Sequence, residues 1–236
     1  MKVLVIPDIH LKPYIFYKAA ELMKKGCADR AVCLMDIADD WKKELCMECY
    51  EQTYDSAIDF AKEFPETLWC YGNHDLSYVW EEPETGYSSI MRNLVCRKLH
   101  QLDEALGENN SIRYVHRIDN VLFCHGGVSR YFVEKYVEAS KYDDTDYVIS
   151  VINGLGNAQM WCDDSPIWYR PQYYNGRMYM PKKYLQVVGH TPVEKIFRYR
   201  NVISCDSFST NPDGTPIGTQ EFVVVDTVTK EFITIS

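Results

Sequence analysis

The 236-residue sequence has no apolar run that approaches the ~20 residues needed to cross a membrane as a helix. It also has no excess of basic residues, since 25 Lys and Arg stand against 34 Asp and Glu and the formal net charge is −9. These absences argue against a membrane protein, a nucleic-acid coat protein and a protein that binds anionic lipid surfaces. A local basic site remains compatible with this composition.

The nine cysteines lack the even number and the regular spacing of a disulfide framework. Four of them lie within or at the end of apolar runs, where a free cysteine behaves as a small hydrophobic residue. These four are Cys33, Cys70, Cys124 and Cys205. The first apolar run is too short for a signal peptide, so we expect a strand to begin at residue 2 and the protein to be cytoplasmic.

Cys46 and Cys49 form an isolated CxxC sequence. No second cysteine pair accompanies it, and it lies within a helical pattern of apolar residues. Two free thiols on a helix are therefore favoured over a redox or zinc site.

Repeats, low-complexity tracts and clear linkers are also missing, which predicts a single domain over residues 1–236. The first half alternates strands with amphipathic helices, and this order implies parallel strands with right-handed crossovers. A Glu-, Pro- and Tyr-rich segment, 76–87, is expected to be a loop over a site. The expected strands are 2–6, 31–35 and 67–71, and the expected helices are 13–25, 44–63 and 88–106.

The second half is dominated by short strands. Segments 112–118 and 121–124 flank Asp119-Asn120 and predict a hairpin. Further expected elements are helices at 129–137 and 145–155 and strands at 185–188, 195–199, 202–205, 222–226 and 231–235. Together with the first half, this pattern predicts an α/β domain with two packed sheets and helices outside them.

Polar side chains recur where the expected strands end. Any one of them alone is better interpreted as a turn residue or a surface histidine. Gathered at one edge of a sheet, they would repel one another or remain unsatisfied unless a cation or a substrate completed them. The set comprises Asp8, His10, Asp36, Asp39, Asn73, His74, His125 and His190.

These donors are carboxylates, an amide and imidazoles, with no thiolate. Such a set suits Mn, Fe, Zn or Mg, with manganese favoured, better than a structural zinc ion. It also exceeds what one catalytic metal usually takes. Two metals about 3.5–4 Å apart, with one bridging carboxylate, fit it better.

The five strand-end segments, in this order and spacing, resemble the motifs of the calcineurin-like metallophosphoesterases. The resemblance covers residues 1 to about 206, and its last motif is similar to the phosphoprotein-phosphatase (Ser/Thr phosphatase-like) branch. It implies a metallophosphoesterase-type β-sandwich of two mixed sheets flanked by helices on both faces. The motifs are Asp8-x-His10, Asp36-x-x-Asp39, Gly72-Asn73-His74-Asp75, His125-Gly126-Gly127 and Gly189-His190-Thr191-Pro192.

The resemblance also implies roles for these residues. Asp36 would bridge two divalent metal ions, and a hydroxide between the ions would attack phosphorus. His74 would protonate the leaving oxygen and would be oriented by Asp39. The first metal would take Asp8, His10 and Asp36, and the second would take Asp36, Asn73, His125 and His190.

Two positions depart from the phosphoprotein-phosphatase branch, which uses two arginines there to clamp phosphate. Asp40-Trp41 replaces an Arg-Gly pair, and Tyr71 replaces the other arginine. We therefore expect weak phosphate recognition, with Asp40 repelling a dianion. Arg170 lies in a segment similar to the branch's Trp-x-Arg and is a candidate substrate ligand, although a surface arginine is an equal alternative. Asp206 matches a late acidic position of the family without an assigned role.

The sequence thus favours a phosphomonoesterase acting on a phosphoprotein or a small phosphorylated molecule, and it identifies no protein partner. An alternative is a phosphodiesterase for dinucleoside polyphosphates or cyclic nucleotides. The aromatic segments 78–87 and 156–179 could stack a base, although loop packing is the favoured interpretation. A non-catalytic scaffold is a third alternative, and the intact His74 and Asp39 argue against it.

Overall fold

A computed structural model describes residues 1–106, 110–173 and 176–236. Its first sheet has five strands in the order β10-β9-β1-β2-β3. As predicted for the first half of the chain, β1, β2 and β3 are parallel, and β9 and β10 extend the sheet in antiparallel fashion. The strands are β1 (Lys2–Ile6), β2 (Arg30–Cys33), β3 (Leu68–Trp69), β9 (Phe222–Asp226) and β10 (Phe232–Ile235).

The second sheet also has five strands, in the order β4-β5-β6-β8-β7. The predicted hairpin is present, since β4 and β5 pair antiparallel from Val115 opposite Cys124 to Ile118 opposite Val121. The strands β5, β6 and β8 are parallel, and β7 closes the far edge in antiparallel fashion. The strands are β4 (Val115–Ile118), β5 (Val121–Cys124), β6 (Leu185–Val188), β7 (Phe197–Tyr199) and β8 (Val202–Ser204).

The two sheets pack face to face through alternate strand residues. Val3 and Val5 of β1 join Phe123 of β5 in a fully buried cluster between the sheets. Leu4 and Ile6 point to the opposite face of the same strand and pack under the helices. This two-residue period is what a strand buried on both faces requires.

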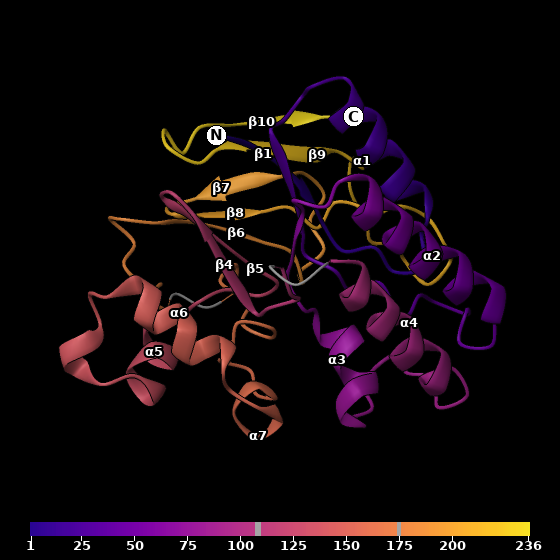
Figure 1. Cartoon of the computed structure of the whole chain (residues 1–236), viewed down its shortest axis with the longest axis horizontal. Helices are drawn as coiled ribbons and strands as arrows, with labels where there is room; N and C mark the ends of the chain where they lie inside the picture. Colours follow the sequence, from indigo (N-terminus) through magenta and orange to yellow (C-terminus); the bar gives the residue numbers. More distant parts are fainter. Residues whose placement is uncertain (107–109, 174–175) are drawn as a thin grey trace.

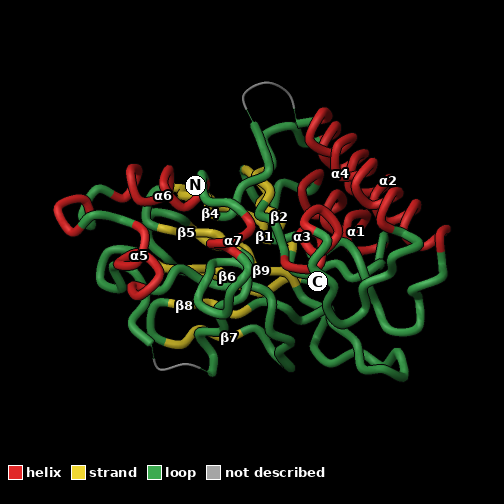
Figure 2. The backbone as a smooth tube through the Cα atoms, turned by 90° about the horizontal axis from the view of Figure 1, so that it is seen from below, coloured by secondary structure: helices red, strands yellow, loops and turns green. Residues whose placement is uncertain are grey.

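Helices cover both outer faces, as Figures 1 and 2 show. One core joins the first sheet to α1 (Tyr14–Lys24), α2 (Met47–Glu63) and α4 (Arg92–Ala105). Another joins the second sheet to α5 (Arg130–Tyr136), α6 (Thr145–Asn153) and α7 (Asn157–Met160). A short 3-10 helix, η1 (Ala139–Lys141), lies between α5 and α6. The predicted α/β/β/α sandwich is therefore confirmed.

The segment expected to be a loop, 76–87, instead begins inside a helix. Helix α3 (Asn73–Trp80) starts directly after Gly72 and ends where Glu81 adopts a left-handed conformation with φ 56°. Its Leu76 and Tyr78 are buried. The prediction was wrong for the first part because the Glu- and Pro-rich composition of the remaining loop dominated the segment.

The expectation of two free thiols at the CxxC sequence was also wrong. Cys46 and Cys49 form a disulfide with 5.3 Å between their Cα atoms, within the usual range for such bridges. Cys46 precedes α2 as its N-terminal cap residue, so the pair straddles the start of the helix rather than lying along it. The four cysteines expected in apolar runs are free and buried.

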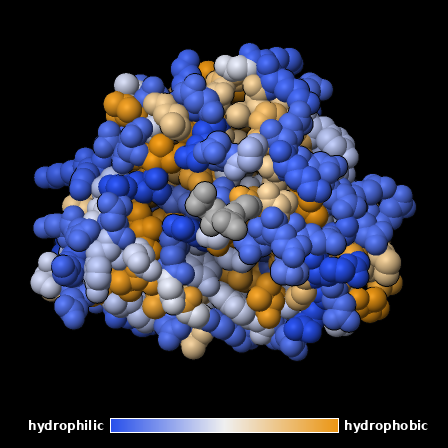
Figure 3. Space-filling model, viewed as in Figure 1, coloured by the Kyte–Doolittle hydropathy of each residue, from blue (hydrophilic) through white to orange (hydrophobic). Residues whose placement is uncertain are grey.

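No helix of the described residues is long and apolar enough to cross a membrane. On the face seen in Figure 3, hydrophilic residues separate small apolar patches.

Candidate active site

The loops that follow the parallel strands of both sheets meet at one place. Every polar residue singled out at a strand end lies there, because the carboxyl ends of parallel strands share an edge of the sheet. The strands β1, β2, β5 and β6 each contribute one loop, and the first turn of α3 contributes the fifth segment. Within this group, Asp8, Asp36, Asp39, Asn73, His125 and His190 are almost completely buried.

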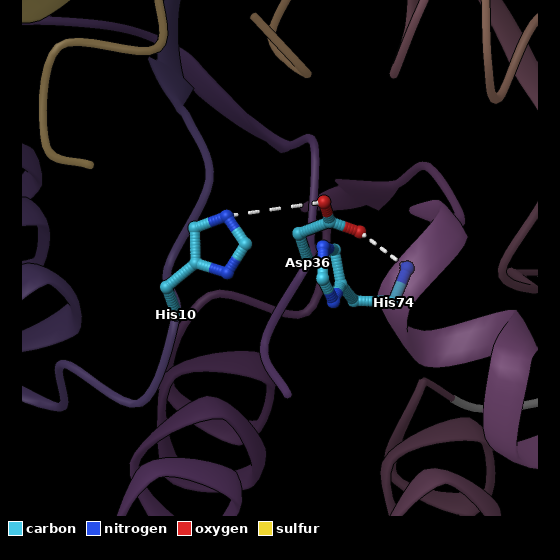
Figure 4. Close-up of side chains that lie close together, drawn as sticks. All are labelled: His10, Asp36 and His74. Carbon is cyan, nitrogen blue, oxygen red and sulfur yellow. Dashed lines mark hydrogen bonds and ion pairs between the residues drawn. The ribbon is translucent and has the colours of Figure 1, made fainter. Parts of the chain in front are cut away.

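Asp36 is the centre of this arrangement. Its Oδ1 accepts a hydrogen bond of 3.0 Å from the backbone N–H of His74. Its Oδ2 lies 3.0 Å from Nε2 of His125 and 4.0 Å from Nε2 of His10. Figure 4 shows the carboxylate between the His10 ring and the first turn of α3.

Two groups of metal-ligating atoms share this carboxylate. One consists of Asp36 with His10 and His74, and the other of Asp36 with His125 and His190. In each group the ligand atoms lie within 4.8 Å of one another. Asp36 is the residue common to both groups, which is the geometry of a bridging ligand.

Backbone carbonyls fix the direction of two imidazoles. Nδ1 of His125 donates to the carbonyl of Leu34 over 2.9 Å, and Nδ1 of His10 lies 3.0 Å from the carbonyl of Asp39. When Nδ1 carries the proton, Nε2 is left with its lone pair. Metal-binding histidines in proteins are usually oriented in this way.

Buried polar atoms without partners indicate that the site is built for a cation. Oδ2 of Asp8 and Nε2 of His190 have no hydrogen-bond partner among the described residues. Such orphaned atoms are costly unless a cation or a substrate completes them. A Cβ atom at Gly72 would collide with the Asp36 carboxylate, and one at Gly189 with that of Asp8. The residues present therefore fit divalent metal ions.

The electrostatics of the buried carboxylates support the same conclusion. Burial, together with the nearby charge of Asp206, raises the pKa of Asp8 well above its usual value. Burial also acts to raise the pKa of Asp36, but the neighbouring His125 and His74 outweigh it and lower that pKa. A bound cation would favour the ionised form of both carboxylates.

Four of these residues hold backbone conformations that are unusual for side chains with a Cβ atom. The φ angles are 44° at His10, 44° at Asp36, 62° at Asp39 and 63° at His190. Each such left-handed residue costs on the order of 1–3 kcal/mol, and such strain clusters at functional sites. The stability of the surrounding fold therefore offsets this strain, which orients the four side chains towards the site.

His74 and Asp39 form a dyad beside the metal-ligating groups. Nδ1 of His74 lies 3.0 Å from Oδ2 of Asp39. The other oxygen of Asp39 accepts hydrogen bonds from the hydroxyls of Tyr50, at 2.7 Å, and Tyr78. Burial lowers the pKa of His74, but the Asp36 charge and the Asp39 hydrogen bond outweigh it and raise the pKa to about 10. Both carboxylates thus favour the protonated form of His74.

Glu84 belongs to the site but was missed from the sequence, as were Tyr50 and Tyr78. Nδ2 of Asn73 donates to both carboxylate oxygens of Glu84, at 2.7 and 2.8 Å. This contact turns Oδ1 of Asn73 towards Nε2 of His125, 3.0 Å away. No motif marks Glu84, and the only sequence signal was an acidic loop expected to cover the site.

Replacing Glu84 with glutamine is expected to weaken metal binding about 10- to 100-fold, the usual effect of losing a partner that orients a ligand. The glutamine keeps only one acceptor oxygen for the NH₂ group of Asn73 and lacks the charge that strengthens this hydrogen bond, so the Asn73 amide is held less firmly with its oxygen towards the metal. Titration of the metal-free protein with Mn²⁺ measures this change. Glu82→Gln, in the same loop but outside the cavity, is the matched control. Equal metal affinities in the two variants would remove Glu84 from this role.

A cavity of about 910 Å³ opens over the dyad. Arg170 lines it, and Nη1 of this residue donates to the His190 carbonyl at 2.7 Å and to Oγ1 of Thr191 at 3.1 Å. Lys42, which the sequence did not single out, also lines it. The aromatic side chains in its wall are Trp41, Tyr87 and Trp168. The cavity therefore offers cations and rings next to the metal-ligating residues.

The two departures from the phosphoprotein-phosphatase pattern have different consequences. The Asp40 side chain is largely buried, and its carboxylate lies 3.6 Å from Nζ of Lys12 and 2.8 Å from Nζ of Lys43. The repulsion of a dianion expected at Asp40 is therefore offset by two cations. Tyr71 packs against Tyr114, with ring centroids 5.8 Å apart, and it does not line the cavity.

Asp206 follows β8 and lines the same cavity. Its carboxylate accepts hydrogen bonds from the N–H of Ser209 at 3.3 Å and from the Ser209 hydroxyl at 2.9 Å. Burial raises the pKa of Asp206 to about 6. It thus adds negative charge beside Asp8 without belonging to either group of metal-ligating atoms.

The comparisons with known proteins agree with this fold. Two crystal structures of cold-active protein tyrosine phosphatases, one named as that of a psychrophilic Shewanella, superpose with TM-scores of 0.55 and 0.54. Their sequences are 16% and 17% identical to this one, and each alignment covers 100% of this chain and 80% of the other. No curated protein sequence matches the chain.

The sequence model of the calcineurin-like phosphoesterase family matches residues 1–209. That range contains all five motifs and the residues that line the cavity except Thr210 and Ile217. The chain therefore belongs to the calcineurin-like phosphoesterases and is a metal-dependent phosphoester hydrolase.

Proposed function

We propose that the protein is a dinuclear-metal phosphomonoesterase. The observation that carries this proposal is that Asp36 belongs to two separate groups of metal-ligating atoms. When bound, two divalent ions supply an activated water as the nucleophile and offset negative charge on the phosphoryl oxygens. One ion would be held by Asp8, His10 and Asp36, and the other by Asp36, Asn73, His125 and His190. Manganese suits this mixture of oxygen and imidazole donors.

In this proposal His74 is the general acid. Its Nδ1 contacts Asp39, which leaves Nε2 to carry a proton to the leaving oxygen. Asp39 keeps the ring oriented and cationic, and the hydroxyls of Tyr50 and Tyr78 hold Asp39 in place. The chain thus provides a proton donor whose position does not depend on a mobile surface group.

Two basic side chains of the cavity would attract a terminal phosphate. The cations Arg170 and Lys42 line this cavity, and Asp40 is neutralised by its lysine partners. A dianionic monoester gains more from these cations than a monoanionic diester does. The substrate would be a phosphoprotein or a small phosphorylated molecule.

A phosphodiesterase for dinucleoside polyphosphates or cyclic nucleotides is the second candidate. The observation that favours it is the set of three rings, from Trp41, Tyr87 and Trp168, in the cavity wall. The Trp41 side chain is 47% exposed and could stack on a base. The Trp168 ring, in contrast, packs edge-on against His190 with centroids 5.4 Å apart, which supports a packing role for that residue.

A substrate panel separates these functions. The protein is reconstituted with Mn²⁺, Fe²⁺, Zn²⁺ or Mg²⁺ and assayed with an aryl phosphate, a bis-aryl phosphate, a phosphopeptide and a dinucleoside polyphosphate. We expect kcat/KM to be highest for a monoester and with Mn²⁺. A higher value for either diester-type substrate would favour the second candidate. Failure of every substrate with every metal would favour a scaffold.

Replacing Arg170 with alanine is expected to raise KM about tenfold for the aryl phosphate, the usual effect of losing a hydrogen bond to a charged group. The effect on the bis-aryl phosphate should be smaller, because that substrate carries less charge. Arg170→Lys should recover little of the loss, since lysine cannot form the two-pronged contact of a guanidinium. Equal changes in KM for both substrates, or no change, would show that Arg170 does not bind the phosphate. Substrate binding would then depend on the metals and the aromatic wall.

A further inference from the structure

A second cavity, of about 760 Å³, lies at the opposite end of the second sheet. Tyr184 and Leu185, at the start of β6, line it, as does Asn201 just before β8. His190 instead follows the far end of β6. Strand β6 therefore runs between the second cavity, at its start, and His190, beyond its end.

The second cavity is strongly basic in a chain whose net charge is −9. Six basic side chains and two acidic ones line it. One of the two acids, Glu134, is already paired with Arg130 over 2.5 Å. The basic residues are Arg130, Arg177, Lys182, Arg198, Arg200 and Lys230. Such a cluster repels itself, and an anionic ligand would relieve that repulsion.

Neutral backbone groups, rather than carboxylates, hold two of these cations in position. Arg198 donates from Nε to the carbonyl of Arg200 at 3.1 Å and from Nη1 to the carbonyl of Lys230 at 3.0 Å. Lys230 donates from Nζ to the carbonyl of Lys183 at 2.5 Å. Across the described ranges, the six cations make a single ion pair to a carboxylate, that of Arg130 with Glu134. The orientation of Arg198 and Lys230 is therefore fixed while their charges remain available.

An apolar wall lies beside the cations. Val133, Met178 and Leu185 are buried residues of this wall. The buried ring of Tyr184 stacks on that of Tyr179, with 6.5 Å between centroids and 12° between planes. The half-buried Tyr142 also lines the cavity. A ligand that fills this space would carry an apolar or aromatic part as well as negative charge.

We propose that this second cavity binds a nucleotide with two or more phosphates, at a site separate from the metal-ligating residues. The several fixed cations suit a multivalent phosphate chain, for which arginine is the favoured partner. The apolar wall with its tyrosines suits the base. The volume lies within the ~300–1,000 Å³ that is typical of small-ligand sites.

The test is calorimetric titration of the metal-loaded, full-length protein with a non-hydrolysable methylene analogue of ADP at about 0.15 M salt, where weak surface attraction is screened. We expect saturable binding of one nucleotide per chain. The same affinity is expected in Asp36→Asn, because the second cavity does not depend on the metal centre. Loss of binding in Asp36→Asn would place the nucleotide at the metal centre and overturn the proposal, as would the absence of saturable binding.

Two variants localise the binding. Arg198→Gln removes the charge and keeps a polar side chain, although a shorter one with fewer hydrogen-bond donors, and Lys182→Ala truncates an exposed side chain that contributes no packing to the core. Each is expected to weaken binding at least fivefold. Lys195→Ala, an exposed lysine outside the cavity, is the matched control and should change nothing. Equal losses in all three variants would show general electrostatic attraction and overturn the proposal.

Two further probes test the chemical class of the ligand. Inorganic pyrophosphate should bind more weakly than the ADP analogue, because it cannot use the apolar wall. Equal affinity for pyrophosphate would contradict the assignment of a nucleotide. A single-stranded oligonucleotide that displaced the analogue at lower concentration would contradict it as well.

Discussion

Replacing Asp36 with asparagine is expected to remove most of the activity and at least one of the two metal ions. The change preserves the volume of the side chain but removes the charge that both groups of metal-ligating atoms share. Loss of a partner that merely supports a ligand lowers metal affinity or activity about 10- to 100-fold. Loss of the bridge itself should exceed that range and should be the largest effect of any single ligand substitution. Metal analysis and kcat/KM for an aryl phosphate measure both consequences.

Asp59→Asn is the matched control for this substitution, because it makes the same chemical change at an exposed position of α2. It should retain full metal content and activity. The interpretation of Asp36 as a bridge is contradicted if Asp36→Asn binds two ions as tightly as the wild type does.

Replacing His74 with asparagine is expected to lower kcat by about 10²–10⁴-fold, the usual contribution of a positioned proton donor, while metal content stays near that of the wild type. The loss should be smaller for a nitrophenyl phosphate, whose leaving group needs no proton. Single-turnover kinetics with an alkyl and a nitrophenyl phosphate compare the two cases.

An alternative role for His74 is that of a metal ligand, since a ring nitrogen of His74 lies within 4.8 Å of the ligand atoms of His10 and Asp36. A variant that lost a metal ion would identify His74 as a ligand instead of an acid. Asp39→Asn supplies a second comparison, because it removes the negative charge beside Nδ1 and leaves the imidazole in place. If His74 is the acid, Asp39→Asn should also lower kcat. The loss should again be larger for the alkyl phosphate than for the nitrophenyl phosphate.

The main features of the site could be predicted because the sequence carries them in local, periodic form. Strands such as Lys2–Ile6 and Val121–Cys124 are short apolar runs, and each is followed within a few residues by a carboxylate or an imidazole. Parallel strands bring their carboxyl ends to one edge, so residues far apart in the chain, such as Asp8 and His190, meet without any further assumption.

What could not be predicted depends on tertiary contacts. Glu84, Tyr50 and Tyr78 reach the site from a loop and two helices, and no spacing rule connects them with Asn73 or Asp39. Each contact acts on the orientation of a neighbouring side chain, which leaves no local pattern in the sequence. These residues therefore become visible only when the fold is known.

The backbone conformations of the site were equally hidden. Non-glycine residues usually avoid positive φ, yet His10, Asp36, Asp39 and His190 adopt it. Tertiary hydrogen bonds, such as that from the N–H of His10 to the carbonyl of Asp36 at 2.8 Å, stabilise these turns. The disulfide of the CxxC sequence was missed because the sequence pattern placed both cysteines inside a helix. Helix α2 in fact begins at Met47, so Cys46 lies outside the helix and can reach Cys49.

The most direct test of the proposed dinuclear centre is a titration of metal-free wild-type protein with Mn²⁺, in which bound metal and aryl phosphatase activity are followed together. The account predicts two bound ions per chain and full activity only when the second site is filled. Full activity with one bound ion, or saturation at one ion per chain, would contradict it.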